Sequence, residues 1–304
     1  MIENLAAEGL KGEIAAINGL LGVSDTLISS RRNPLVKRLR SLSSRAGREE
    51  EGLLLLEGTH LLQELVRLKL QPAELIATER WYQRHAQLLV GVNQAIPRRL
   101  VTDEVLTAAL STVTPDGVAS LCPYSALPLA PKDAHFLLVL DRIQDPGNLG
   151  TLLRTALAAD VQNVWLGSGV DPLGSKSLRA SAGALLQLPH HRFGPDEDTA
   201  ISQLTDELKR LAAGGMQVVA TLVPGSQVPI RPVPYWELNW RLPTALVLGT
   251  EGAGLHPELL ACCTHAVTLP HSSRVESLNV AAAAVPLLLE RRRATMTATT
   301  QQSG

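Results

Sequence analysis

The second half of this 304-residue chain alternates apolar runs with segments of helical character, and no other feature restricts the fold as strongly. The apolar runs predict strands at residues 135–141, 163–166, 217–222, 244–249 and 266–269. The intervening and following segments predict helices at residues 148–159, 175–185, 198–213 and 277–293. Strands that are apolar along their whole length are typical of a parallel sheet with helices on both faces. We therefore expect an α/β domain built on a parallel sheet.

Residues 124–134 contain prolines and separate this region from the first half of the chain. Upstream, short apolar runs again alternate with helix-like segments, as in a smaller α/β domain. A chain of this length can bury two separate cores. The predicted division is an N-terminal extension at 1–25, the smaller domain at 26–123, a linker at 124–134, the parallel-sheet domain at 135–293 and a disordered tail at 294–304.

The formal net charge of -1 excludes a uniformly basic nucleic-acid-binding protein, but one segment is strongly basic. It contains seven basic residues and no acidic one: Arg31, Arg32, Lys37, Arg38, Arg40, Arg45 and Arg48. Such a run is either a solvated helix face or a phosphate-binding surface, and charge alone does not separate the two.

Cysteines and apolar runs limit the remaining classes of protein. Cys122, Cys262 and Cys263 form neither a disulfide framework nor a CxxC metal site, as expected for a reducing cytoplasm. Residues 278–289, the longest apolar run, are too few to span a bilayer. Charged residues interrupt residues 1–25 before a signal-peptide core could form. We predict a cytoplasmic protein without a membrane segment or a metal site.

Three stretches carry side chains suited to a site, and all lie at or just after the carboxyl ends of expected strands. They are DRIQDPGNLGTLLRTA (141–156), LVLGTEGAGL (246–255) and LPHSSRVESLNVAAAAVPLLLE (269–290). Open α/β sheets bind ligands at this edge. Taken singly, each has a structural explanation: a helix capped by Asn148, a glycine turn, and a closely packed alanine-rich helix that begins near Ser277.

Several other patterns do not support a site. The order GxxGxG in the second stretch differs from the GxGxxG fingerprint of dinucleotide-binding proteins. In GVDPLGSKS (169–177), a serine separates Gly174 from Lys176, so the ending of a phosphate-binding loop is broken. His190 and His191 have no third ligand at a metal-like spacing.

In this order, the three stretches resemble the SpoU (TrmH-like) branch of the SPOUT RNA methyltransferases, whose motifs read N-x-G-x-x-x-R, G-x-E-G-x-G and S-L-N. The resemblance covers about the last 165 residues. Residues 29–64 are similar to the substrate-binding domain often found before it, which has an L30e-like fold. The N-terminal resemblance favours RNA contact as the role of the basic run.

The resemblance implies a C-terminal trefoil knot, a homodimer and S-adenosylmethionine as cofactor. By position, the implied cofactor contacts are Gly249, Gly252, Leu269 and Leu278. The implied catalytic residues are Arg154, Asn148, Glu251, Ser277 and Asn279. The implied RNA contacts are Arg31, Arg32, Lys37 and Arg38. The third motif departs from the family pattern, because His271 and Ser273 replace the usual methionine and glycine.

The implied activity is methylation of a ribose 2'-hydroxyl in structured RNA, with ribosomal RNA as the first choice of substrate. Two alternatives remain: a tRNA 2'-O-methyltransferase, and a non-catalytic RNA-binding protein that retains the knotted fold. A nicotinamide-dependent oxidoreductase lacks its fingerprint in this sequence.

Overall fold

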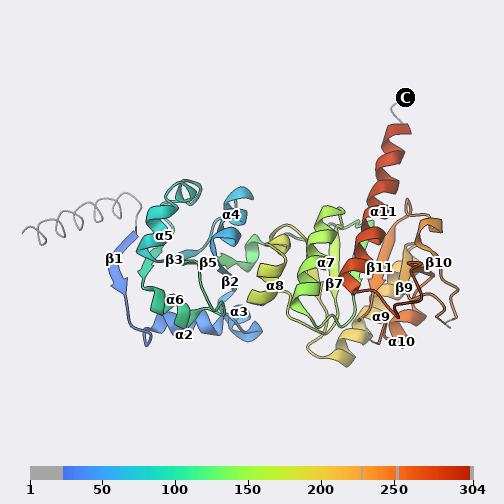
Figure 1. Ribbon diagram of the computed structural model, residues 1–304, viewed down its shortest axis with the longest axis horizontal. Coiled ribbons are helices and arrows are strands. Elements are labelled where there is room, and N and C mark those ends of the chain that lie inside the picture. Colours follow the sequence, from blue (N-terminus) through green and yellow to red (C-terminus); the bar gives the residue numbers. More distant parts are fainter. Residues whose placement is uncertain (1–22, 227–228, 251–252, 302–304) are drawn as a thin grey trace, which may run out of the picture. The chain divides into compact units, whose positions relative to one another are not determined.

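The computed structural model describes residues 23–226, 229–250 and 253–301 (Figure 1). The chain divides into two compact units. Unit 1 comprises residues up to Leu127 together with 173–175, and unit 2 comprises 128–172 and the residues from Lys176 onward.

Unit 1 is built on a mixed five-stranded sheet of order β1-β4-β3-β5-β2. Its strands are β1 (Val23–Ile28), β2 (Leu53–Glu57), β3 (Glu74–Ala77), β4 (Arg98–Val101) and β5 (Val118–Pro123). Strand β4 is parallel to β1 and β3, whereas β5 is antiparallel to β2 and β3. Because β1 pairs with β4 from Val23, the sheet begins before the predicted boundary at residue 26.

Helices of unit 1 cover this sheet with narrow apolar faces. They are α2 (Pro34–Ser41), α3 (Arg45–Glu51), α4 (Thr59–Arg67), α5 (Glu79–Arg84) and α6 (Asp103–Ala109). In α2, Leu35 and Leu39 are four residues apart and therefore share one face of the helix. That face packs with α6 and the sheet in one buried cluster, so the basic residues of α2 are directed elsewhere.

Unit 2 contains a seven-stranded sheet of order β10-β12-β9-β11-β6-β7-β8, and every pair of neighbouring strands is parallel. Its strands are β6 (Phe136–Leu140), β7 (Asn163–Leu166), β8 (His190–Arg192), β9 (Gln217–Leu222), β10 (Val233–Pro234), β11 (Thr244–Leu248) and β12 (His265–Thr268). The predicted parallel α/β sheet is confirmed. The two edge strands, β8 and β10, were not predicted, since two or three residues are too few for a recognisable apolar pattern.

The helices of unit 2 are α7 (Pro146–Ala158), α8 (Ser175–Ala180), α9 (Glu197–Ala213), α10 (Pro257–Ala261) and α11 (Val280–Gln301). Helices α9 and α10 bury one face of the sheet in a cluster that includes Leu204, Leu259 and Val247. Helices α7 and α11 pack against each other (Figure 1). Among the described residues, no helix is both long and apolar enough to cross a membrane.

Three helix ends differ from the prediction. Helix α8 stops at Ala180, because Ala182 and Gly183 take left-handed backbone conformations with φ of 50° and 77°. Helix α11 begins at Val280 rather than at residue 277, after Asn279, whose side chain accepts hydrogen bonds from the amides of Ala281 and Ala282. The same helix continues to Gln301, past residue 294, where the tail was predicted to begin.

Candidate functional site

The first and third sequence stretches meet at the start of α7. Asp145, not Asn148 as predicted, is the N-cap of this helix: its carboxylate accepts a hydrogen bond from the amide of Asn148 at 2.7 Å. Pro146 occupies the first helical turn, where a missing N–H is tolerated, which moves the cap upstream. The side chain of Asn148 accepts a hydrogen bond from Asn279 at 3.0 Å, and this bond joins residues 131 positions apart.

The described residues of the second stretch, 246–250 and 253–255, pack closely against one another at the end of β11. A β-carbon added to Gly249 would lie 2.3 Å from the carbonyl carbon of Gly254, so only glycine fits. Gly254 itself has a φ of 67° and donates its amide hydrogen to the carbonyl of Thr250 at 3.0 Å. The backbones of Gly249 and Gly254 are thus in direct contact immediately beyond the strand.

A buried ion pair at the end of β6 holds this loop. The Asp141 carboxylate is fully buried and accepts hydrogen bonds from Nε and Nη2 of Arg142, at 3.0 and 3.1 Å, and from the amide of His256 at 2.8 Å. Arg142 adopts a φ of 54° and also lies 3.4 Å from the carbonyl of Gly254. Hydrogen bonding to Asp141, against the effect of burial, raises the pKa of Arg142. Sequence reasoning assigned no role to this pair, although a charged dipeptide that directly follows an apolar strand marks it.

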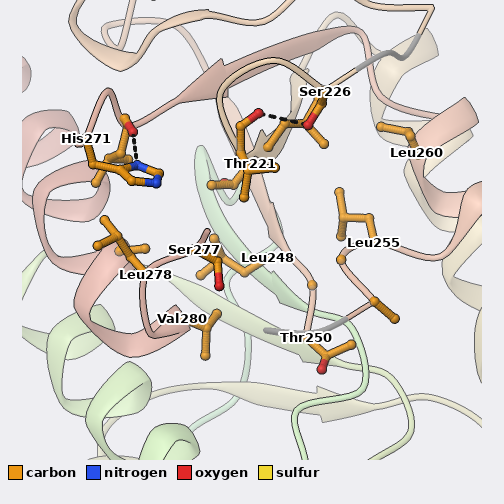
Figure 2. A pocket seen from close by; sticks show the side chains of 17 residues that line it. Thr221, Ser226, Leu248, Thr250, Leu255, Leu260, His271, Ser277, Leu278 and Val280 are labelled. Carbon is orange, nitrogen blue, oxygen red and sulfur yellow. Dashed lines mark hydrogen bonds between the residues drawn. The ribbon is translucent and has the colours of Figure 1, made fainter. Parts of the chain in front are cut away.

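A cavity of about 340 Å3 opens at the carboxyl ends of β9, β11 and β12 (Figure 2). Its walls come mainly from residues 221–226, 248–250, 253–255, 269–271 and 277–283. Leucine and valine side chains dominate these walls, and no lysine or arginine lines the cavity among the residues that the structure describes. Its volume lies in the usual range of small-molecule sites, about 300–1,000 Å3.

The structure brings several of the predicted residues together at this cavity. Gly249, Leu269 and Leu278 line it, as does Ser277, which was expected to be catalytic (Figure 2). Asn148 and Asn279 form their hydrogen bond outside the cavity lining. Glu251 and Gly252 lie outside the described residues.

Arg154 occupies a different position from the other predicted residues. It is exposed on α7, six residues after Asn148, and does not line the cavity. Its side chain makes no hydrogen bond or ion pair within the described ranges. Its guanidinium is therefore available to bind a ligand.

The sequence did not point to the end of β9 and the segment that follows it, which contribute Thr221, Val223 and Ser226 to the cavity. This segment contains no recognisable motif. The order of the strands in the sheet places this segment at the cavity. Since β9 lies between β11 and β12, its carboxyl end lies next to the carboxyl ends of those two strands.

The basic run of unit 1 separates into exposed and engaged residues. Arg31, Arg32 and Lys37 are exposed. Arg38 forms ion pairs with Glu51 at 2.7 Å and Glu74 at 2.6 Å. Burial opposes the charge of Arg38, but hydrogen bonds to these two carboxylates outweigh burial and raise its pKa.

Arg48, another member of the run, is buried and donates hydrogen bonds to the carbonyls of Leu42 and Ser43. The run is thus partly a structural element of unit 1.

The cysteines have no reactive environment. Burial raises the pKa of Cys122 to about 11 and that of Cys263 to about 12. Both thiols stay protonated near neutral pH, which makes them poor nucleophiles. Within the described part of the chain, no group of three or more His, Cys, Asp or Glu side chains is arranged to hold a metal ion.

Two protein-family models match the chain. The model of the SpoU rRNA Methylase family matches residues 135–288, and that of the MRM3-like substrate binding domain matches residues 33–120. The first match contains all three motif stretches up to residue 288, and the second contains most of the basic run.

Individual proteins agree with these matches. A Synechocystis protein named as an uncharacterized tRNA/rRNA methyltransferase is 40% identical over 276 residues, which are 90% of this chain and 96% of that protein. The 23S rRNA (guanosine(2553)-2'-O)-methyltransferase RlmP of Bacillus subtilis is 30% identical over 87% of this chain and 98% of its own length. A solved structure of an AdoMet-bound rRNA methyltransferase from Sinorhizobium meliloti superposes with a TM-score of 0.70 at 27% identity, covering 90% of this chain and 98% of that one. The chain belongs to the SpoU rRNA Methylase family.

Proposed function

We propose that this protein transfers a methyl group from S-adenosylmethionine to a ribose 2'-hydroxyl in structured RNA, with ribosomal RNA as its substrate. The observation that carries this proposal is the cavity at the carboxyl edge of the parallel sheet, which the second and third family motifs line. The relatives named above support it, since RlmP acts on 23S rRNA. The family that matches residues 135–288 is described as an rRNA methylase family, which favours ribosomal over transfer RNA.

The cavity suits the proposed cofactor in size and charge. Leu269 and Leu278 offer apolar surfaces for the adenine ring, while Gly249 lets the backbone approach closely. The described lining contains no lysine or arginine that would repel a sulfonium. When bound, the cofactor supplies an activated methyl group on this sulfonium, so the chemistry requires no metal ion. Gly252 is proposed as a further contact by its place in the motif.

The proposed catalytic residues act on the ribose and its phosphate. An arginine guanidinium keeps its proton near neutral pH, so a role as general base is unfavourable. Arg154 instead orients the target hydroxyl and stabilises the negative charge that develops on its oxygen as the hydroxyl proton passes to solvent water. The bonded pair Asn148 and Asn279 positions the ribose, and Ser277 and Glu251 complete the site by their motif positions.

Replacement of the arginine tests this role. Arg154→Lys retains the charge but loses the planar set of donors, so we expect turnover to fall at least about tenfold while cofactor affinity is unchanged. Arg210→Lys is the matched control, because Arg210 is an exposed arginine of α9 that pairs with Glu207 on the same helix. Normal turnover of Arg154→Lys would refute the assignment.

Further proposals concern the whole molecule. We propose a trefoil knot in unit 2, an L30e-like fold for unit 1, and a homodimer that uses α11. Helix α11 has exposed apolar side chains, Val285 and Leu289, and these support the dimer because burying them in an interface removes apolar surface from water. A cytoplasmic location fits a ribosomal RNA substrate.

The activity itself is tested by incubating the full chain with S-adenosylmethionine and either ribosomal or transfer RNA. A 2'-O-methyl group blocks alkaline cleavage of the adjacent phosphodiester, so a methylated position appears as a gap in the hydrolysis ladder. We expect a gap in ribosomal RNA and none in transfer RNA. Gaps only in transfer RNA would favour the tRNA enzyme. Cofactor and RNA binding without any gap would favour a non-catalytic RNA-binding protein.

A further inference from the structure

His271 contributes an imidazole ring to the wall of the cavity. It follows β12 by three residues and lines the cavity together with Leu278 (Figure 2). Its Nδ1 is 2.7 Å from the carbonyl oxygen of Leu269, and Figure 2 shows the other ring nitrogen, Nε2, turned toward the interior of the cavity. The ring is therefore held by one nitrogen and presents the second.

The bond to Leu269 determines which nitrogen carries the proton. A carbonyl oxygen only accepts hydrogen bonds, so Nδ1 must be the donor. In the neutral ring, Nε2 then has a lone pair and acts as an acceptor. His271 thus offers a hydrogen-bond acceptor at a defined place on the wall.

The surroundings of Nε2 make this acceptor significant for a bound ligand. Most side chains of the lining are apolar, and Ser226, one of the few polar ones, already donates its hydroxyl to the carbonyl of Val223. His271 is the single ionisable side chain among the described residues that line the cavity. A ligand that fills the cavity displaces water from Nε2. The complex is then destabilised unless the ligand supplies a hydrogen-bond donor to Nε2.

We infer that Nε2 of His271 accepts a hydrogen bond from the adenosyl part of the cofactor, whose ribose hydroxyls and exocyclic amine are donors. This inference rests on the proposed function. The adenosyl part is favoured over the amino-acid part because the ring is anchored to Leu269 and shares the cavity wall with Leu278, the two apolar residues that suit adenine. His271 is thus a specificity-determining residue for the cofactor.

Two amide substitutions separate the roles of the two ring nitrogens. The side-chain amide of Asn reaches the position of Nδ1, whereas the longer amide of Gln reaches that of Nε2. We expect His271→Ala and His271→Asn to bind S-adenosylmethionine about five- to tenfold more weakly, and His271→Gln to bind within about twofold of the unchanged protein. Calorimetric titration of the full chain measures these affinities. His265→Ala is the matched control, because His265 is an exposed histidine at the start of β12 that does not line the cavity.

Titration with 5'-methylthioadenosine, which lacks the amino-acid part, tests which portion of the cofactor is bound. The inference predicts the same loss of affinity for this probe. A loss confined to S-adenosylmethionine would overturn the assignment to the adenosyl part. Full affinity in His271→Asn with a loss in His271→Gln would overturn the role of Nε2, since the bond to Leu269 alone would then matter.

Binding by the unchanged protein distinguishes this inference from the proposed function. If the unchanged protein binds and His271→Ala binds equally well, only the contact at His271 is refuted. If the unchanged protein binds neither probe, the proposed function fails and the contact fails with it. Equal melting temperatures of the variants establish that an affinity change is not caused by unfolding.

Discussion

Gly249 leaves no space for a side chain, because its backbone lies directly against that of Gly254. The neighbouring Asp141 and Arg142 prevent the loop from moving away, since they bind the amide of His256 and lie near the carbonyl of Gly254. A single methyl group at position 249 must therefore displace backbone rather than a flexible side chain.

We expect Gly249→Ala to destabilise unit 2 by about 1–3 kcal/mol and to weaken cofactor binding at least about tenfold. Gly214→Ala is the control: Gly214 has a φ of -77°, and the nearest atom to an added β-carbon is 3.4 Å away. Thermal unfolding and calorimetric titration measure the two effects. Cofactor binding by Gly249→Ala equal to that of Gly214→Ala would show that the loop is not part of the site.

Ser273 illustrates how a departure from the family pattern is accommodated. A glycine at this position could adopt a left-handed conformation that serine rarely does. Ser273 is not among the described residues with positive φ, so its backbone is ordinary, as the sequence required.

The helices show how local sequence sets their ends. Helix α7 begins at a proline preceded by the capping Asp145, and α9 likewise begins after a capping aspartate, Asp196. Each aspartate accepts one backbone amide, and Asp196 also accepts the hydroxyl of Thr199. Only the first cap holds an amide of a proposed catalytic residue, Asn148.

This difference gives a prediction for the two caps. We expect Asp145→Ala and Asp196→Ala each to lower the melting temperature by about 2–4 °C, because each helix loses one capped amide. Methyl transfer should fall only in Asp145→Ala, since Asn148 then loses its position relative to Asn279. Equal activity of the two variants would separate the start of α7 from the catalytic site.

At the scale of the whole molecule, one buried carboxylate makes the free energy of unfolding of unit 1 depend on pH. Glu57 accepts hydrogen bonds from the amides and hydroxyls of Ser111 and Thr112. Burial acts to raise the pKa of Glu57, but these hydrogen bonds outweigh burial, so the pKa is lowered. A lowered pKa in the folded state stabilises the protein above the unfolded value, about 4.3, and this stabilisation is lost as the pH falls through the folded pKa.

We therefore expect Glu57→Gln to lower the melting temperature at pH 7, with a difference from the unchanged protein that shrinks as the pH falls below about 4.3. Glu49→Gln removes an exposed carboxylate that pairs with Arg45 and should have little effect at any pH. Differential scanning fluorimetry across this range measures both variants. A difference that does not change with pH would contradict the role of the Glu57 charge.

RNA recognition is the second property of the whole molecule. We expect the triple change Arg31→Gln, Arg32→Gln and Lys37→Gln to weaken RNA binding and to reduce the slope of log affinity against log salt by about three, one for each lost phosphate contact. Arg38→Gln should instead lower the melting temperature, because Glu51 loses the ion pair with Arg38 and Glu74 keeps only its pair with Arg99. Binding in a salt series measures the slopes. An unchanged slope for the triple variant would remove these residues from the RNA site.

The apolar pattern of the sequence determined the parallel sheet, because strands buried on both faces must be apolar throughout and chains of this kind have few alternatives. Strands β7 and β9 have the predicted bounds, and the three motif stretches lie at the predicted sheet edge. Motif order identified the family, and in the proposed site Gly249, Leu269, Ser277 and Leu278 share one cavity.

Contacts between distant residues could not be predicted in the same way. Three such features depend on which strands are neighbours in the sheet. They are the hydrogen bond between Asn148 and Asn279, the hydrogen bond from the amide of His256 to Asp141, and the part of the cavity wall formed by residues 221–226. Likewise, Arg38 and Arg48 look like Arg31 in the sequence, yet the first two are held by carboxylates and carbonyls. The physical reason is that periodicity reports the burial of a side chain along its own element, whereas a polar partner is chosen by the three-dimensional arrangement of elements.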